Sequence, residues 1–229
     1  MKDSLPQASP ARSILVDLKS FPCLSTGNDS NVYRIRDQVA KEYHTLSFDK
    51  VARYVALQNE AVKALKLRPY QAEIKIKNVP HLVVVNEAIP VNELALSASG
   101  RPLTLSRYVE APNFEKLLWR PEMFEKYAQT QLSDPALLKF AFDMNSFFWT
   151  EYPTRAQDEF HYHICMLSRL LDRWLGVSGC YISRYNVKLR PVLNQPRIDL
   201  IITDLALYID RVIYGSESDC LARQGTPAQ

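Results

Sequence analysis

The sequence has few cysteines, and their spacing does not fit the usual zinc frameworks. The four cysteines are Cys23, Cys165, Cys180 and Cys220, and no two of them form a C-x-x-C pair. The four histidines complete no zinc pattern with them either. We therefore expect reduced thiols, rather than a disulfide framework or a cysteine-based metal site.

Long apolar runs and a strong charge of one sign are also missing. No stretch reaches the roughly 20 apolar residues that a membrane-spanning helix needs, and the N-terminal segment lacks the apolar core of a secretory signal. The net charge of the 229-residue chain is only +3, which is too mild to indicate nucleic acid or an anionic membrane as the main partner. With 47% hydrophobic and 23% charged residues, the composition is that of a globular protein. We expect a cytoplasmic protein with neither nucleic acid nor a membrane as partner.

The first half of the chain shows strand-like alternation around one helical segment. Its expected elements have the order β, β, α, β, β and cover 31–35, 39–43, 48–67, 81–89 and 102–109. A tight reversal at Arg36–Gln38 joins the first two strands, and Arg68-Pro69 ends the helix. We expect residues 90–101 to form a polar connection.

The second half is mainly helical. We expect helices over 113–118, 121–131, 134–151 and 155–175, then strands over 186–189 and 198–203. Asp134 before Pro135 favours a helix start, with aspartate at the cap and proline at the first position. The pattern predicts an α+β protein whose lobe boundary lies near Ala111. Its expected parts are a partly mobile extension (1–19), a lobe of sheet plus one helix (20–110), a reduced helical lobe (111–214) and a flexible tail (215–229).

A turn-forming loop precedes the first expected hairpin. It contains Ser25, Gly27 and Ser30 and is followed by Val32. Small residues let backbone amides approach an anion closely, so this loop is a candidate phosphate-binding turn. Taken alone, the same residues are explained better by an ordinary hairpin entry.

Four polar residues stand at positions that allow either a chemical or a structural role. Lys41 lies in an apolar strand, where it either extends its amine to the edge or meets an acidic partner such as Glu60. Asp204 follows an apolar strand and suits either a hard cation or a helix cap. Asn186, at the start of another expected strand, is equally ambiguous by itself.

The order of these features resembles the protein-kinase family over residues 20–210. The loop is similar to G-x-G-x-x-G-x-V, Lys41 to the strand lysine and Glu60 to its helix partner. Asn186 resembles the catalytic-loop asparagine, and Asp204 in Thr-Asp-Leu-Ala resembles the aspartate of D-F-G. The resemblance implies ATP bound with Mg²⁺ on Asn186 and Asp204. It also implies a two-lobed fold with an N-terminal antiparallel sheet plus one helix and a reduced helical C-terminal lobe, as in compact bacterial kinase-like proteins.

The segment Ser106-Arg-Tyr108-Val-Glu is similar to the hinge that binds adenine in that family, with Ser106 at the back of the pocket. The catalytic loop departs from the family, because Tyr181 stands where the catalytic aspartate is expected. Ser183 and Arg184 then remain as the polar residues near a hydroxyl acceptor.

The resemblance leaves three functions to distinguish. The first is a divergent phosphotransferase that acts on a hydroxyl of a protein or a small molecule, and the second is a pseudokinase-like protein that binds ATP and Mg²⁺ without chemistry. The third is a protein-interaction module that has lost nucleotide binding. The missing aspartate favours the second over the first.

Overall fold

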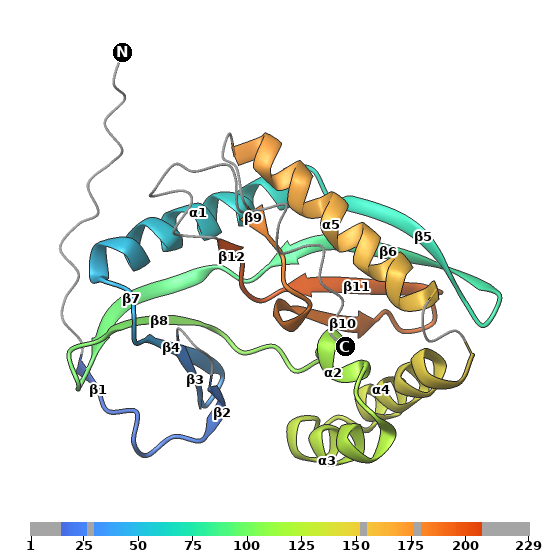
Figure 1. The fold of residues 1–229 in the computed structure, drawn as a ribbon, viewed down its shortest axis with the longest axis horizontal. Helices are drawn as coiled ribbons and strands as arrows, with labels where there is room; N and C mark the ends of the chain where they lie inside the picture. The colour runs from blue at the N-terminus through green and yellow to red at the C-terminus, as the bar shows by residue number, and fades with distance from the viewer. Residues whose placement is uncertain (1–14, 27–29, 152–154, 176–179, 208–229) are drawn as a thin grey trace, which may run out of the picture. The chain divides into compact units, whose positions relative to one another are not determined.

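The computed structural model describes residues 15–26, 30–151, 155–175 and 180–207, and Figure 1 shows their fold. They form two larger sheets, a two-stranded pair and five α-helices, so the predicted α+β class is confirmed. The chain divides into two compact units, residues 1–59 with 90–109 and residues 60–89 with 110–229. The tail expected over 215–229 and most of the extension expected over 1–19 lie outside the described residues.

The first unit contains a six-stranded sheet with the order β1-β7-β8-β4-β3-β2. Its strands are β1 (Leu15–Val16), β2 (Cys23–Thr26), β3 (Ser30–Ile35), β4 (Gln38–Tyr43), β7 (Val91–Ser97) and β8 (Pro102–Arg107). All neighbouring strands are antiparallel except β1 and β7, which are parallel. The predicted hairpin is β3 and β4, which pair from Ser30 opposite Tyr43 to Ile35 opposite Gln38.

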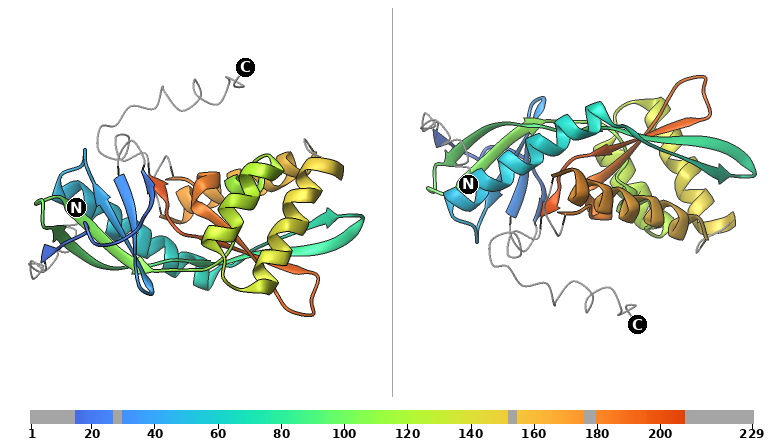
Figure 2. Two further views of the ribbon diagram at one scale, coloured as in Figure 1. Left: turned by 90° about the horizontal axis from the view of Figure 1, so that it is seen from below. Right: turned by 90° about the horizontal axis from the view of Figure 1, so that it is seen from above.

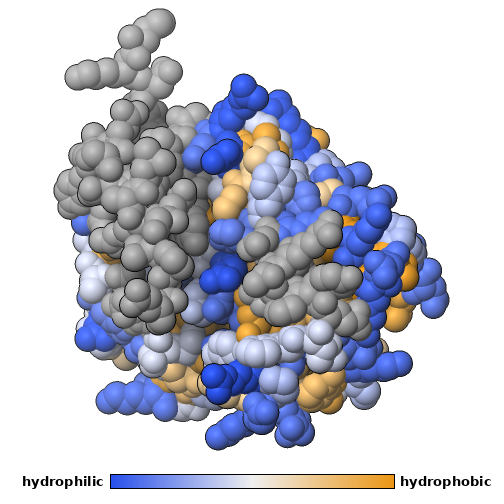
Figure 3. Space-filling view, turned by 45° about the vertical axis from the view of Figure 1, so that its right-hand side comes forward, coloured by the Kyte–Doolittle hydropathy of each residue, from blue (hydrophilic) through white to orange (hydrophobic). Residues whose placement is uncertain are grey.

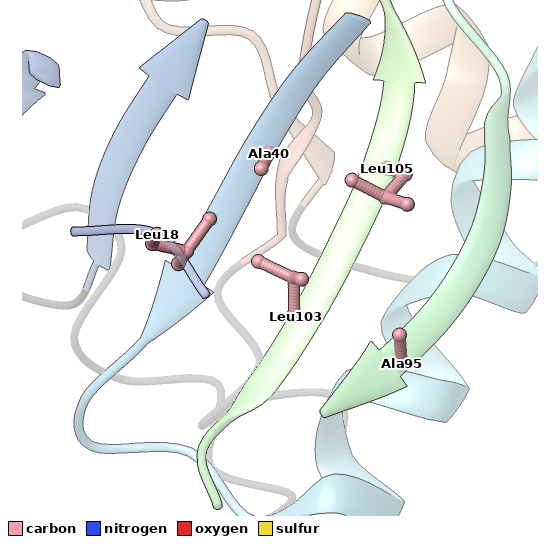
Figure 4. Close-up of a cluster of buried hydrophobic side chains, with 5 residues drawn as sticks. All are labelled: Leu18, Ala40, Ala95, Leu103 and Leu105. Atoms are coloured by element: carbon pink, nitrogen blue, oxygen red, sulfur yellow. The ribbon is translucent and has the colours of Figure 1, made fainter. Parts of the chain in front are cut away.

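One face of this sheet carries a compact apolar cluster. Its buried members, shown in Figure 4, are Leu18, Ala40, Ala95, Leu103 and Leu105. Ala40 lies opposite Leu105, and Ala95 lies opposite Leu103. Directly opposed residues share a face of a sheet, so the residues that alternate with them along β4 and β8 belong to the other face.

Helix α1 (Phe48–Leu67) has the predicted bounds. The Ser47 hydroxyl accepts a hydrogen bond from the Lys50 amide at its start (3.4 Å), and Arg68-Pro69 follows its end. In the first unit its Tyr54 ring meets the Tyr43 ring edge-on, with centroids 6.2 Å apart. The helix therefore covers the Tyr43 face of β4, and alternate residues along a strand share a face.

The second unit is built on a four-stranded sheet with the order β10-β11-β6-β5. Its strands are β5 (Tyr70–Ile76), β6 (Val79–Ala88), β10 (Val187–Pro191) and β11 (Arg197–Ile202). Strands β6 and β11 are parallel, and the other neighbours are antiparallel. The expected lobe of residues 20–110 thus contributes strands to both larger sheets.

Helices follow in the expected places. They are α2 (Phe114–Leu117), α3 (Pro121–Gln131), α4 (Pro135–Ser146), which continues as a π-helical turn over Phe147–Glu151, and α5 (Arg155–Leu175). Asp134 caps α4 as predicted, because its side chain accepts from the Ala136 amide at 2.8 Å. Figures 1 and 2 show α5 running along the second sheet, and an apolar pocket between them is lined by Ile164, Leu167 and Leu200 among others.

Two expectations about the sheets were wrong. Residues 90–101, expected as a polar connection, include β7, which fills the place between β1 and β8. No strand was expected over residues 70–76, where β5 pairs with the whole first part of β6. Lys77 and Asn78 join these two strands with φ angles of 51° and 63°, the left-handed conformation that a two-residue hairpin turn requires.

No described helix is both long enough and apolar enough to cross a membrane. The face drawn in Figure 3 is mainly hydrophilic, with hydrophobic side chains in small separate groups.

Candidate functional site

The predicted phosphate-binding residues lie on strands β2, β3 and β4 of the first unit. Ser25 is opposite Val32, and Val32 is opposite Lys41, so these three residues form one row on one face of the sheet. Ser30 begins β3 and is buried. Gly27 lies outside the described residues.

Lys41 occupies the face of β4 that α1 covers. Its Nζ lies 5.1 Å from the centroid of the Tyr43 ring and 5.9 Å from that of Tyr54. Rings at these distances attract an ammonium group through their electron-rich faces. The amine is therefore held close to aromatic side chains of its own unit, in the row that includes Ser25 and Val32.

Glu60, the expected partner of Lys41, is exposed on α1. Its carboxylate accepts a hydrogen bond from Lys63 Nζ at 2.6 Å, and 57% of its side chain is accessible. An exposed pair of this kind contributes little to stability. The pairing of Glu60 with Lys41 stays a prediction.

The expected hinge residues lie beside the N-terminal end of β4. Ser106 pairs with Val39 and with Val91 on the neighbouring strands. The Tyr108 amide donates to the Asp37 carbonyl at 2.8 Å, and the Arg34 guanidinium lies 4.1 Å from the Tyr108 ring centroid. The amide of Tyr108 is thus already used, and its expected adenine contact stays a prediction.

The structure brings the backbones of the two predicted metal ligands together in the second unit. The Asn186 carbonyl accepts hydrogen bonds from the Thr203 amide (2.8 Å) and from the Thr203 hydroxyl (3.1 Å). Asp204 is the next residue, and its Oδ1 oxygen is buried. In addition, β9 (Cys180–Tyr181) pairs with β12 (Ala206–Leu207), which places Tyr181 opposite Ala206. The segments 180–186 and 203–207 therefore run side by side.

Between those pairings the chain makes one short turn of 3-10 helix over Arg184–Asn186. Ser183 caps it, because its hydroxyl accepts from the Tyr185 amide at 3.3 Å. Arg184 Nε lies 3.1 Å from Glu115 Oε2. The predicted residues Ser183 and Arg184 thus lie in a fixed turn that leads directly to Asn186.

Sequence reasoning missed Glu115, the carboxylate that contacts this turn. It lies in the first turn of α2, after the capping residue Asn113. Its charge is the main cause that raises the pKa of Tyr185, followed by burial and a hydrogen bond between the two side chains. Acidic residues are common in the first turn of any helix, so the local sequence carried no signal for this contact.

Two histidines of α5, His161 and His163, each lie close to another polar side chain. His163 Nδ1 lies 2.6 Å from the Tyr70 hydroxyl beside the apolar pocket of the second unit. Burial lowers the pKa of His163, and the nearby charge of Glu159 opposes that effect. His161 Nε2 lies 3.5 Å from Cys165 Sγ. Within the described residues, no three or more histidine, cysteine, aspartate or glutamate side chains gather as metal ligands.

The sequence matches no protein-family model and no curated protein at a significant level.

Proposed function

We propose that the chain is a kinase-like protein that binds ATP together with Mg²⁺. The observation that carries this proposal is the pair of hydrogen bonds from Thr203 to the Asn186 carbonyl, at 2.8 and 3.1 Å. They fix Asn186 beside the residue that precedes Asp204, and in the family that the sequence resembles such a pair holds magnesium against the phosphates. The sheet of the first unit then corresponds to the N-terminal lobe, and α2–α5 correspond to the helical lobe.

The donor atoms of this pair suit Mg²⁺. The ion binds oxygen and is usually held by one or two carboxylates, by water and by the phosphates of the nucleotide. Asp204 supplies a carboxylate with a buried oxygen, and Asn186 supplies an amide oxygen. Two protein ligands are enough for such a site, since the nucleotide completes it.

In the first unit, we assign Lys41 to the phosphates of the nucleotide. The row Ser25, Val32 and Lys41 supports this assignment, because it places the lysine on the same face as the residues that enter the candidate loop. A lysine acts on phosphate as a compact positive charge, and its flexible stem lets it reach a group outside its strand.

Rapid phosphoryl transfer is not part of the proposal. Tyr181 stands in place of the catalytic aspartate, and a phenol with an ordinary pKa near 10 is a poor base at neutral pH. The segment from Tyr181 to Asn186 contains no carboxylate of its own. We therefore propose binding as the principal activity, with any transfer to a hydroxyl of a protein or small molecule being slow.

The first test is thermal stabilisation of the purified chain by nucleotides. A ligand that binds only the folded state at 100 times its Kd adds about 2.7 kcal/mol of stability. ATP with Mg²⁺ should raise the melting temperature, whereas AMP with Mg²⁺ should raise it much less. Equal melting temperatures with and without ATP would favour an interaction module that has lost nucleotide binding.

The variant Tyr181→Asp tests whether the missing carboxylate is what makes phosphoryl transfer slow. Restoring a carboxylate to the loop should raise the rate of ATP hydrolysis above that of the wild-type protein, because the new base can orient and deprotonate water. Release of inorganic phosphate measures the rate. An unchanged rate in a variant that still binds ATP and Mg²⁺ would remove Tyr181 from the position assigned to it.

A further inference from the structure

The capping residue of helix α2 is hydrogen-bonded to the 3-10 turn that contains Arg184. The Asn113 side chain accepts from the Lys116 amide at 3.3 Å and donates to the Tyr185 carbonyl at 2.5 Å. Beside this, the Leu189 amide donates to the Pro112 carbonyl at 2.9 Å. Two hydrogen bonds from adjacent residues therefore hold the start of α2 against the segment 185–189, and Glu115 lies in the first turn of that helix.

Glu115 is largely buried, with 15% of its side chain accessible, and its carboxylate meets the 3-10 turn at Arg184. Oε2 lies 3.1 Å from Arg184 Nε, so the carboxylate and the guanidinium form an ion pair. Opposite charges at this distance attract each other more strongly where water is partly excluded. Glu115 is therefore well suited to fix the position of Arg184.

Arg184 retains further binding capacity in this arrangement. A guanidinium group has five N–H donors, of which Nε carries one and the two terminal nitrogens carry four. The Arg184 side chain is 40% accessible while its Nε is held by Glu115. Arginine donors match the geometry of phosphate oxygens, and Arg184 stands two residues before the proposed magnesium ligand Asn186.

We propose that Glu115 is a positioning residue that holds Arg184 for the terminal phosphate of the bound nucleotide. This inference rests on the proposed function, because it concerns the same nucleotide. It adds a carboxylate from α2 to a loop that has none, and it gives that carboxylate a role in recognising a triphosphate rather than in taking a proton.

The test compares the affinities of the full chain for ATP and ADP, each with Mg²⁺, by titration calorimetry. The quantity of interest is the ratio of the Kd for ADP to the Kd for ATP, since only ATP carries the γ-phosphate. Arg184→Ala should lower this ratio about tenfold, the effect of losing one charge-assisted hydrogen bond. Glu115→Gln, which keeps the side-chain size but removes the charge, should lower it several-fold.

The double variant should lower the ratio no further than Arg184→Ala alone, because Glu115 acts through Arg184. Arg184→Lys keeps the positive charge, but one ammonium cannot reproduce both the Nε contact and a forked phosphate contact, so it should also lower the ratio. Glu122→Gln, an exposed change on α3, is the matched control and should leave the ratio unchanged.

The outcomes separate the two proposals. Wild-type protein that binds ATP, together with an unchanged ratio in Arg184→Ala and Arg184→Lys, would overturn this inference and leave the proposed function standing. Additive effects of Glu115→Gln and Arg184→Ala would overturn the positioning role. A wild-type protein that binds neither nucleotide would overturn the proposed function and this inference with it. A purely structural role for Glu115 would lower the melting temperature without moving the ratio.

Discussion

Replacing Asp204 by asparagine removes one negative charge while keeping the size of a side chain whose Oδ1 oxygen is buried. In the proposed site that charge faces Mg²⁺, so its loss should weaken the binding of ATP with Mg²⁺. The contact is charge-assisted and contributes about 1–3 kcal/mol. At 1.4 kcal/mol for each factor of ten, the Kd should rise about fivefold to 150-fold.

The effect of Asp204→Asn on the affinity for ATP should reverse when magnesium is removed. Without the ion, the Asp204 carboxylate and the phosphates are both negative and repel each other. Asp204→Asn should then bind ATP as tightly as the wild-type protein or more tightly. A general loss of folded protein cannot produce this reversal, because it would weaken binding under both conditions.

Titration calorimetry with ATP, with Mg²⁺ and with EDTA, measures all four affinities. Asp143→Asn provides the matched control, since Asp143 is exposed on α4 and takes no part in the proposed site. Equal Kd values for wild type and Asp204→Asn in the presence of magnesium would refute the assignment of Asp204. Equal losses with and without magnesium would also refute it.

Three further predictions follow from particular contacts. Lys41→Ala should weaken binding of ATP with Mg²⁺ by about 1–3 kcal/mol, measured by calorimetry, and an unchanged Kd would remove Lys41 from the site. Phe114→Ala should lower the free energy of unfolding in urea by about 3–5 kcal/mol, because Phe114 is fully buried with its ring centroid 5.5 Å from that of Phe160; a loss below 1 kcal/mol would contradict the described core. Burial lowers the pKa of His163 in the folded state, so the unfolded chain binds more protons and stability should fall as the pH drops through the unfolded value near 6.5. Between pH 8 and pH 5.5, the free energy of unfolding measured in urea should fall less in His163→Asn than in the wild type. Identical falls in the two proteins would argue against this effect.

Local patterns predicted the helices well, and two of the helices have clearly marked ends. Helix α1 ends before Arg68-Pro69, and α4 begins at Pro135 after the capping Asp134. Helix α5 has the predicted bounds, and its Phe160 and Leu171 are buried. These signals lie within a few residues of one another, so the sequence alone was sufficient.

The partners of the strands were much harder to predict from the sequence than the helices. Strand β6 pairs in parallel with β11, which lies more than a hundred residues later in the chain, and no local pattern specifies such a partner. Strand β5 had a usable signal, because Ala72, Ile74 and Ile76 alternate with polar residues before the turn at Lys77–Asn78. The polar residues Asn92 and Glu93 obscured β7, whose position depends on its neighbours β1 and β8.

For the site, the order of motifs led to Asn186 and Asp204 as metal ligands, and that assignment stays a prediction. The Asn186 carbonyl accepts hydrogen bonds from the Thr203 amide and from the Thr203 hydroxyl, as a turn before β10 and the end of β11 allow. The contact between Glu115 and Arg184 could not be predicted from the sequence, because it depends on how α2 packs against a turn far along the chain. The pairing of Lys41 with Glu60 stays a prediction, suggested by the apolar strand around Lys41 and by the family resemblance.

The most direct test of the central claim is a calorimetric titration of the wild-type chain with ATP, with and without Mg²⁺. We predict saturable binding that is markedly tighter with Mg²⁺, since Asn186 and Asp204 would hold the ion against the phosphates. Absence of binding under both conditions, or binding that does not respond to magnesium, would contradict the proposed ATP–magnesium site.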